Sequence, residues 1–284
     1  MSTQHAQRSV FSVRCNAFTL VELLVSMLII SILAGLVMFA MNSAMESVKI
    51  TRTRSMILKI DRVIRQLWDE SESRRLPIVI SAGTPAEAAY QRAGAVWERQ
   101  RLELPERLTD VQDPPNGLFP LPLVTQAYQR AAENGTKYLQ TAEFLYLILK
   151  MASDEDGSAI DRFSPKYIGD QDADGMPEIW DAWGTPIRFL RWAPGFQGID
   201  PQIDPSNPEI PPLYPLVVSA GADRKFDIAF YVDAEPIHYS QQSSPYTTHG
   251  DDEVQMGQPV DADNDGRDDL DNIHNHSIST RLRQ

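Results

Sequence analysis

The hydrophobic pattern sets the N-terminal end of the chain apart from the rest. Residues 18–41 are almost wholly apolar and contain a single charged side chain, Glu22. A helix rises about 1.5 Å per residue, so this run spans roughly 36 Å, more than a bilayer hydrocarbon core of about 30 Å. Arg8 and Arg14 precede it, and such basic residues stay on the cytoplasmic side. The pattern predicts a single-pass transmembrane helix with its N-terminus in the cytoplasm.

A secretory signal peptide and a plain membrane anchor are the simpler interpretations of this run. A signal peptide has an apolar core of about 7–15 residues followed by a small-residue cleavage site, whereas this run is longer and no such site follows. A carboxylate in a membrane costs about 2.5–3.5 kcal/mol at the centre and less near an end. Glu22 therefore needs a partner, and no Lys or Arg within the run supplies one.

Beyond residue 41 the helical pattern continues in amphipathic form. Apolar side chains recur at spacings of three and four between Met56 and Leu67, and charged side chains fill the other positions. Neither Gly nor Pro occurs between Gly35 and Pro77. The sequence predicts one long helix over residues 18–72, with its second half packed on a folded head.

The head, expected over residues 73–232, mixes helical and strand patterns. Thr84 and Glu87 form a capping box around Pro85, which opens a helix through about Leu102. Loops are expected where proline and other turn formers gather, and short apolar runs between turns predict strands. Further helices are expected at 123–132 and 142–152, strands at 187–192, 216–218 and 228–232, and loops at 105–122 and 200–215. The predicted fold class is α+β.

Residues 233–284 are polar and acidic and have no apolar period, so they are expected to form a partly disordered tail. His238, His249, His274 and His276 lie in this tail and are expected to be solvated. No P-loop, dinucleotide fingerprint or nucleophile elbow occurs in the chain. No enzymatic activity and no catalytic residue is therefore predicted.

Residues 17–23, Ala-Phe-Thr-Leu-Val-Glu-Leu, resemble the prepilin processing motif of type IV pilins and type II secretion pseudopilins. The resemblance implies that a prepilin peptidase cleaves between Ala17 and Phe18, removes residues 1–17 as a leader and methylates the new amine. It also implies that Glu22 pairs with the amino terminus of a neighbouring subunit during assembly, which supplies the missing partner. The family usually has Gly before the cut and often a helix-bending proline in the apolar stretch, whereas this chain has Ala17 before the cut and no proline between Phe18 and Arg75.

The same resemblance implies the architecture and location of the molecule. A pilin-like fold packs the long N-terminal helix on a small antiparallel sheet, here with extra helices and calcium-type loops. The apolar half of the helix lies in the inner (cytoplasmic) membrane, and the head faces the periplasm. The implied partners are the peptidase, other subunits of the filament, and an inner-membrane secretion platform.

Charge and cysteine content narrow the possible partners further. The formal net charge is −13, which argues against nucleic-acid binding because phosphate neutralisation needs clustered Lys and Arg. An acidic chain instead suits divalent cations. Cys15 is the only cysteine and lies in the expected leader. The mature chain would then have neither a disulfide nor a thiolate metal site.

The acidic loop from Asp170 to Asp181 has the ligand spacing of a calcium loop. Oxygen-bearing side chains stand at positions 1, 3, 5, 9 and 12, Gly175 allows the sharp turn at position 6, and Met176 offers its backbone carbonyl at position 7. No long helix is expected to enter this loop. The alternative is a solvated acidic turn. The candidate ligands are Asp170, Asp172, Asp174, Met176, Glu178 and Asp181, and calcium is expected to be a structural ion.

A second acidic loop in the tail repeats the first half of this spacing. Its candidate ligands are Asp261, Asp263, Asp265 and Asp269. Two further segments, D-x-W-G-x-P from Asp181 and S-x-G-A-D from Ser219, are similar in order and type to the C-terminal half of the major pseudopilin of type II secretion systems. By that resemblance Asp223 is one more candidate calcium ligand.

The leading hypothesis is a structural subunit of a type II secretion-like pseudopilus. A surface pilin for adhesion, motility or DNA uptake is a second hypothesis. A membrane-anchored calcium-binding protein that never polymerises is a third, and it predicts that replacing Glu22 leaves assembly unaffected.

Overall fold

The computed structural model describes most of the chain in nine stretches, and the helices and strands below all lie within them. The stretches are residues 19–74, 83–112, 122–132, 139–154, 157–193, 196, 215–230, 257–260 and 272–277. Two compact units divide between Val48 and Lys49.

The first unit contains the start of helix α1 (Leu20–Ser73), which is uninterrupted over its length and confirms the predicted long helix. Up to Val48 its large apolar side chains are exposed, among them Leu20 and Phe39 at 76% each. None of the most apolar stretch of α1 is buried. By length and composition, α1 is the one candidate membrane span among the described residues.

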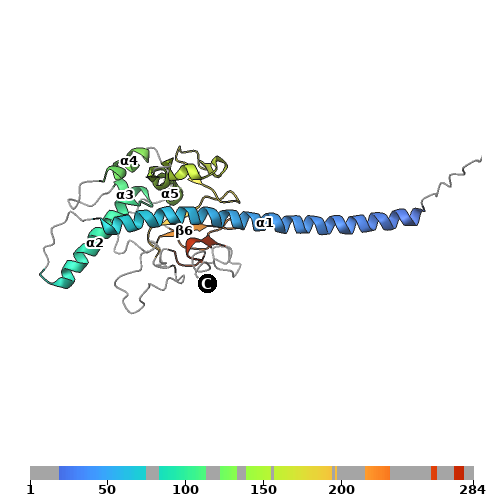
Figure 1. Ribbon diagram of the computed structural model, residues 1–284, viewed down its shortest axis with the longest axis horizontal. Coiled ribbons are helices and arrows are strands. Elements are labelled where there is room, and N and C mark those ends of the chain that lie inside the picture. The colour runs from blue at the N-terminus through green and yellow to red at the C-terminus, as the bar shows by residue number, and fades with distance from the viewer. Residues whose placement is uncertain are drawn as a thin grey trace, which may run out of the picture. The chain divides into compact units, whose positions relative to one another are not determined.

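In the second unit, from Lys49 onward, α1 buries one apolar face in the core of the head. Met56, Ile60 and Ile64 follow one another at a spacing of four, so a single stripe points inward. This stripe belongs to the same hydrophobic cluster as Phe144, Phe189 and other residues of the head. Figure 1 shows helices α3 to α5 above this part of α1 and strand β6 below it. The amphipathic pattern thus predicted the packing of this half correctly.

The described part of the head also contains the helices α2 (Pro85–Glu103), α3 (Leu108–Gln112), α4 (Leu123–Ala131) and α5 (Gln140–Met151). The capping box of α2 is formed as predicted, since Thr84 Oγ1 accepts from Glu87 N and Glu87 Oε2 accepts from Thr84 N. On the apolar face of α5, Phe144, Leu145, Leu147 and Ile148 are buried and Met151 is half-buried. The expectation of a loop over 105–122 is wrong at α3, whose Asp110 and Val111 are buried.

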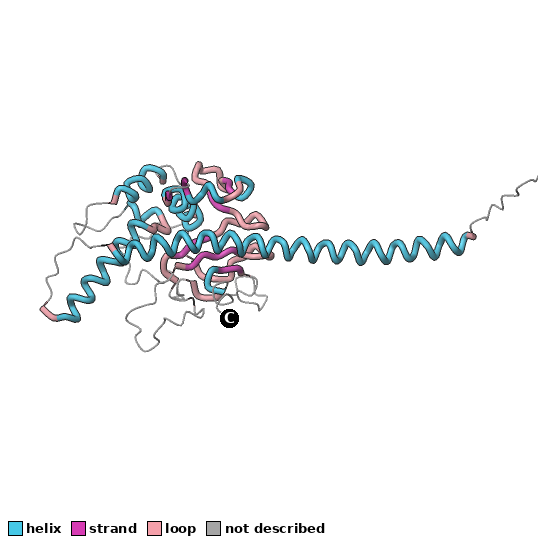
Figure 2. The backbone as a smooth tube through the Cα atoms, in the orientation of Figure 1, coloured by secondary structure: helices cyan, strands magenta, loops and turns pink. Residues whose placement is uncertain are grey.

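The strands are short (Figure 2), and all their pairings are antiparallel among the described residues. β5 (Arg188–Leu190), β6 (Leu216–Ser219) and β7 (Ile273–His274) form one sheet in that order, with Phe189 opposite Val217 and Ser219 opposite Ile273. Two smaller pairs complete the set: β1 (Ser153–Asp154) with β2 (Gly157–Ser158), and β3 (Ile168–Gly169) with β4 (Glu178–Ile179). The expected α+β class is confirmed. Of the strand expected at 228–232, Ile228 alone forms a bridge, with Pro259, and residues 231–232 lie outside the described residues.

Part of the segment expected to be a disordered tail belongs to the sheet. Ile273 and His274 pair with β6, and the side chain of Asn275 is fully buried. Asn275 Nδ2 donates to Asp61 Oδ1 on α1 at 2.7 Å and to Pro215 O at 2.9 Å, while its Oδ1 accepts from Val217 N. The polar character of this segment predicts exposure to solvent, whereas the Asn275 amide satisfies buried backbone groups and joins the sheet to α1.

A buried ionic network joins the helices to the sheet. The Arg191 guanidinium, fully buried after β5, donates to Asp110 Oδ2 at 2.9 Å, to Glu106 Oε1 at 3.3 Å and to Leu104 O at 2.9 Å. Its backbone N–H donates to Glu106 Oε2. Burial raises the pKa of Glu106 despite the nearby guanidinium. Burial acts the same way on Asp110, but Arg191 and Arg107 outweigh it and lower the pKa of that carboxyl.

Candidate assembly and cation-binding sites

The residues expected to govern processing and assembly stand at the start of α1. Ala17 and Phe18 lie outside the described residues. Thr19 and Glu22 form a capping box, in which the backbone N–H and the hydroxyl of Thr19 each donate to Glu22 Oε2 at 2.9 Å, and Glu22 N donates to Thr19 Oγ1 at 3.2 Å. Glu22 therefore caps its own helix in a single chain. This is a local role in addition to the pairing that the sequence predicts.

The first acidic loop connects β3 to β4, and neither flanking element is a helix, as expected. Asp170 accepts backbone N–H groups from Asp174 at 3.2 Å and from Gly175 at 2.9 Å, and Asp174 Oδ1 accepts from Met176 N at 2.7 Å. Gly175 has a φ of +94°, a conformation that side chains disfavour. The predicted need for glycine at this position is thus met.

Two groups of carboxylates gather at this loop. Oxygen atoms of Asp170, Asp172 and Glu178 lie within 4.8 Å of one another, and so do those of Glu143, Asp172 and Asp174. Glu143 comes from α5 and is 1% exposed. The sequence spacing of the loop gave no sign of Glu143, although a carboxylate within the apolar face of a helix is unusual enough to mark it. Asp172 is shared by both groups, so the two can act as one cation site.

Glu178 is the fully buried carboxylate of the group that it forms with Asp170 and Asp172. Its Oε2 accepts from Gln171 N at 3.0 Å and from Trp180 Nε1 at 3.3 Å, whereas the buried Oε1 has no hydrogen-bond partner among the described residues. Burial raises the pKa of Glu178 to about 7, and Asp172 and Asp170 add smaller repulsions in the same direction. A buried carboxylate oxygen without a donor, beside two other carboxylates, favours a cation as its partner.

Asp181, the expected last ligand of the loop, lies elsewhere. Its Oδ1 accepts from Trp183 N at 2.8 Å and from Thr185 N at 2.9 Å, and its Oδ2 accepts from Ser219 Oγ at 2.7 Å. It is 1% exposed and belongs to neither carboxylate group. Asp181 thus holds the turn that follows β4 and joins the D-x-W-G-x-P segment to the S-x-G-A-D segment.

Of the remaining candidate ligands, Met176 is expected to offer its backbone carbonyl, and its side chain is buried in the core. Asp223 is exposed, and its Oδ1 accepts from Lys225 N at 2.8 Å. Asp261, Asp263, Asp265 and Asp269 lie outside the described residues. Val260 and Asn272, the described residues on either side of this second acidic loop, are hydrogen-bonded to the head. Val260 N donates to Asp227 O, and Asn272 Nδ2 donates to Phe226 O.

The two histidines at β7, His274 and His276, pack against neighbouring side chains of the head. The ring of His274 packs edge-on against Phe196 with centroids 4.8 Å apart, and its Nδ1 accepts from Ser277 N. Burial lowers the pKa of His274 to about 4, with a smaller contribution from the charge of His276. The expectation that His274 is solvated is therefore wrong. The two carboxylate groups found among the described residues contain no histidine.

A family model described as the prokaryotic N-terminal methylation motif matches residues 13–38. The matched stretch contains Ala17, Phe18 and Glu22 together with most of the apolar start of α1. No curated protein and no solved structure gives a significant match. The motif and the long apolar helix confirm the resemblance to type IV pilin-like proteins, a structural rather than enzymatic class. The motif indicates a substrate of prepilin peptidase that is anchored in a membrane and assembles with pilin-like subunits.

Proposed function

We propose that this chain is a pseudopilin, a structural subunit of a type II secretion-like pseudopilus. Cleavage between Ala17 and Phe18 releases the leader, and the apolar half of α1 stays in the inner membrane with the head in the periplasm. The methylation motif carries the proposal, because it includes the start of a helix whose first half is exposed and whose second half is part of the head core.

The choice of a pseudopilin over a surface pilin is supported by the C-terminal half of the head. The D-x-W-G-x-P and S-x-G-A-D segments, which resemble the major pseudopilin, are joined by the buried bond between Ser219 Oγ and Asp181 Oδ2. A buried hydroxyl–carboxylate bond of 2.7 Å fixes the relative position of the two turns. The two segments therefore form one structural unit.

Deletion of the gene in its own bacterium separates the two kinds of filament. A pseudopilin is expected to be needed for export of a folded protein across the outer membrane, with motility and DNA uptake unchanged. The measurements are the amount of exported protein in the medium, twitching on a surface and transformation frequency, each restored by the wild-type gene. Normal export together with lost twitching or DNA uptake would contradict the proposal and favour a surface pilin.

We propose in addition that the β3–β4 loop binds calcium as a structural ion. Asp170, Asp172, Asp174, Glu178 and Glu143 offer carboxylate oxygens, and the backbone carbonyl of Met176 remains available from the original spacing. Calcium takes six to eight oxygen ligands, whereas zinc prefers nitrogen and sulfur. A cation here would neutralise carboxylates that lie within 4.8 Å of one another and would connect α5 to the loop.

Calcium is expected to raise the melting temperature of the head relative to the protein in chelator. At about 100 times the dissociation constant, a bound ion stabilises the folded state by about 2.7 kcal/mol. For a domain of this size the melting temperature should rise by about 5–10 °C. The measurement is thermal unfolding in calcium and in chelator at matched ionic strength. An equal melting temperature in both conditions would contradict calcium binding.

Two isosteric variants identify the residues that bind the ion. Glu143→Gln is expected to reduce the calcium-dependent rise in melting temperature by at least half, because it removes a ligand charge while keeping the buried shape. Asp181→Asn is expected to lower the melting temperature in chelator and in calcium alike, because Asp181 accepts three hydrogen bonds outside the site. The matched control for the loss of one negative charge is Asp69→Asn, because the Asp69 side chain is exposed on α1. If Asp181→Asn alone abolished the calcium response, the assignment of Glu143 would be wrong.

A further inference from the structure

The polar surface of α1 in the head is divided by charge along the helix. Between Lys49 and Gln66 the sequence has six basic residues and one acid, Asp61. Asp61 is 7% exposed and is bound by Asn275 and by Arg65. The next stretch, residues 67–73, has three acidic residues and no basic one. A positive section of the helix is therefore followed directly by a negative one.

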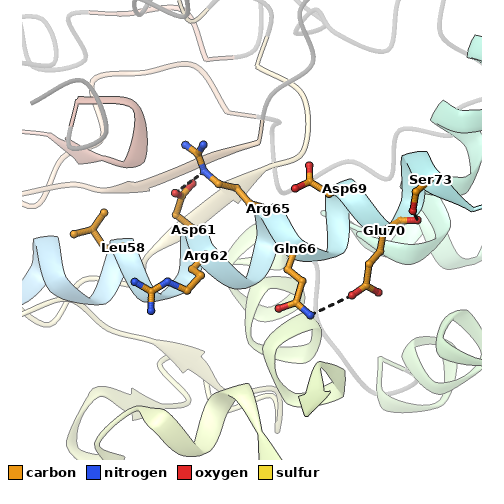
Figure 3. A pocket seen from close by; sticks show the side chains of 8 residues that line it. All are labelled: Leu58, Asp61, Arg62, Arg65, Gln66, Asp69, Glu70 and Ser73. Atoms are coloured by element: carbon orange, nitrogen blue, oxygen red, sulfur yellow. Dashed lines mark hydrogen bonds and ion pairs between the residues drawn. The ribbon is translucent and has the colours of Figure 1, made fainter. Parts of the chain in front are cut away.

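The boundary between the two sections is exposed and hollowed. Figure 3 shows α1 from Leu58 to Ser73, with Arg62, Arg65 and Asp61 nearer the Leu58 end and Asp69 and Glu70 nearer the Ser73 end. These side chains line an open hollow of about 790 Å³. Arg62 and Asp69 are exposed, and among the described residues neither has an ion-pair or hydrogen-bond partner. Their neighbours are engaged, Arg65 with Asp61 and Glu70 with Gln66 and Arg74.

Arg62 and Asp69 stand seven residues apart, so they share one face of α1 and are separated by about 10.5 Å along its axis. Copies anchored in one membrane by the same N-terminal helix must run parallel. With no axial shift, each Arg62 would face another Arg62, which is repulsive. With a shift of about 10.5 Å, Arg62 of one copy lies level with Asp69 of the next.

We propose that this exposed face of α1 is a self-complementary contact in which Arg62 of one subunit pairs with Asp69 of its neighbour in a parallel, axially shifted array. The inference rests on the proposed function, since it requires that the chain forms a filament. The predicted pairing of Glu22 with a neighbouring amine at Phe18 likewise requires parallel copies that are shifted along the helix axis. The charge pattern therefore specifies a second copy of this chain as the partner that binds this face of α1.

The test is a charge swap in the full chain, expressed with its peptidase and assembly platform. Arg62→Glu and Asp69→Arg are each expected to reduce sheared filaments about five- to thirtyfold, because each places like charges at the contact. The double variant R62E/D69R is expected to recover wild-type assembly to within about twofold, because the pair is restored with reversed signs. Arg92→Glu, on the exposed surface of α2, is the control for the same change of net charge.

Filaments are measured relative to the processed chain in the membrane, and the melting temperature of each variant checks that the head is folded. Wild-type amounts of filament from Arg62→Glu, or a double variant that assembles no better than the single variants, would overturn the pairing and leave the proposed function standing. A processed wild-type chain that forms no filament would overturn the proposed function and the pairing with it. An equal loss in the Arg92→Glu control would also overturn the pairing.

Discussion

Replacing Glu22 by glutamine is expected to abolish filament assembly while processing and the fold of the head remain unchanged. In the single chain Glu22 caps α1 through Thr19, and glutamine at this position of a capping box keeps those hydrogen bonds. What glutamine loses is the negative charge that the neighbouring ammonium needs. In a water-poor helix bundle, an ammonium left without its partner costs about 3–5 kcal/mol, which corresponds to more than a hundredfold in subunit association. The measurement is the amount of sheared filament at equal amounts of processed chain.

The matched control is Thr19→Val, which removes the hydroxyl of the capping box and keeps the carboxylate. Loss of a helix N-cap costs about 1 kcal/mol, so assembly should fall only severalfold. The opposite order of effects, with Glu22→Gln assembling normally and Thr19→Val failing, would show that Glu22 acts as a cap and does not pair with an amine. Normal assembly of both variants would indicate that contacts other than the Glu22–amine pair and the helix cap hold the subunits of the filament together.

Replacing Arg191 by methionine is expected to cost about 3–5 kcal/mol of folding free energy, the largest stability loss expected of any substitution considered for the head. Methionine fills a similar length but leaves Glu106 and Asp110 buried with no guanidinium between them. It also removes the donors to Leu104 O and Arg101 O. Denaturant unfolding of the head measures the loss.

Arg92→Met on the exposed face of α2 is the control for removal of an arginine and is expected to change the free energy of unfolding by less than about 0.5 kcal/mol. A triple variant in which Glu106 and Asp110 are also made neutral and isosteric, R191M/E106Q/D110N, should recover part of the loss because no charge remains buried. An Arg191→Met protein as stable as the control would contradict the structural role of the network.

Elements with a strong local pattern could be predicted from the sequence. The apolar run of α1, its amphipathic continuation, the capping box at Thr84 and the buried face of α5 all depend on residues a few positions apart. Local spacing also located the acidic turn and its glycine at residue 175. Each of these features is determined within one element, so its neighbours in the sequence are enough to reveal it.

Features that depend on distant partners could not be predicted in the same way. Glu106 and Asp110 read as loop residues because their partner, Arg191, comes from the sheet. Asn275 and His274 read as tail residues because β6 and α1 provide their surroundings. At the acidic loop, spacing suggested Asp181 as the closing ligand, whereas the fold uses Asp181 to hold the next turn and brings Glu143 from α5 instead.

The central claim, that this chain is a processed type IV pilin-like subunit, is tested most directly by mass spectrometry of the N-terminus of the membrane-bound protein. The mature chain is expected to begin at Phe18, to carry a methyl group on its amine and to lack the leader residues, Cys15 among them. A chain that still begins at Met1 in cells with an active prepilin peptidase would contradict this claim.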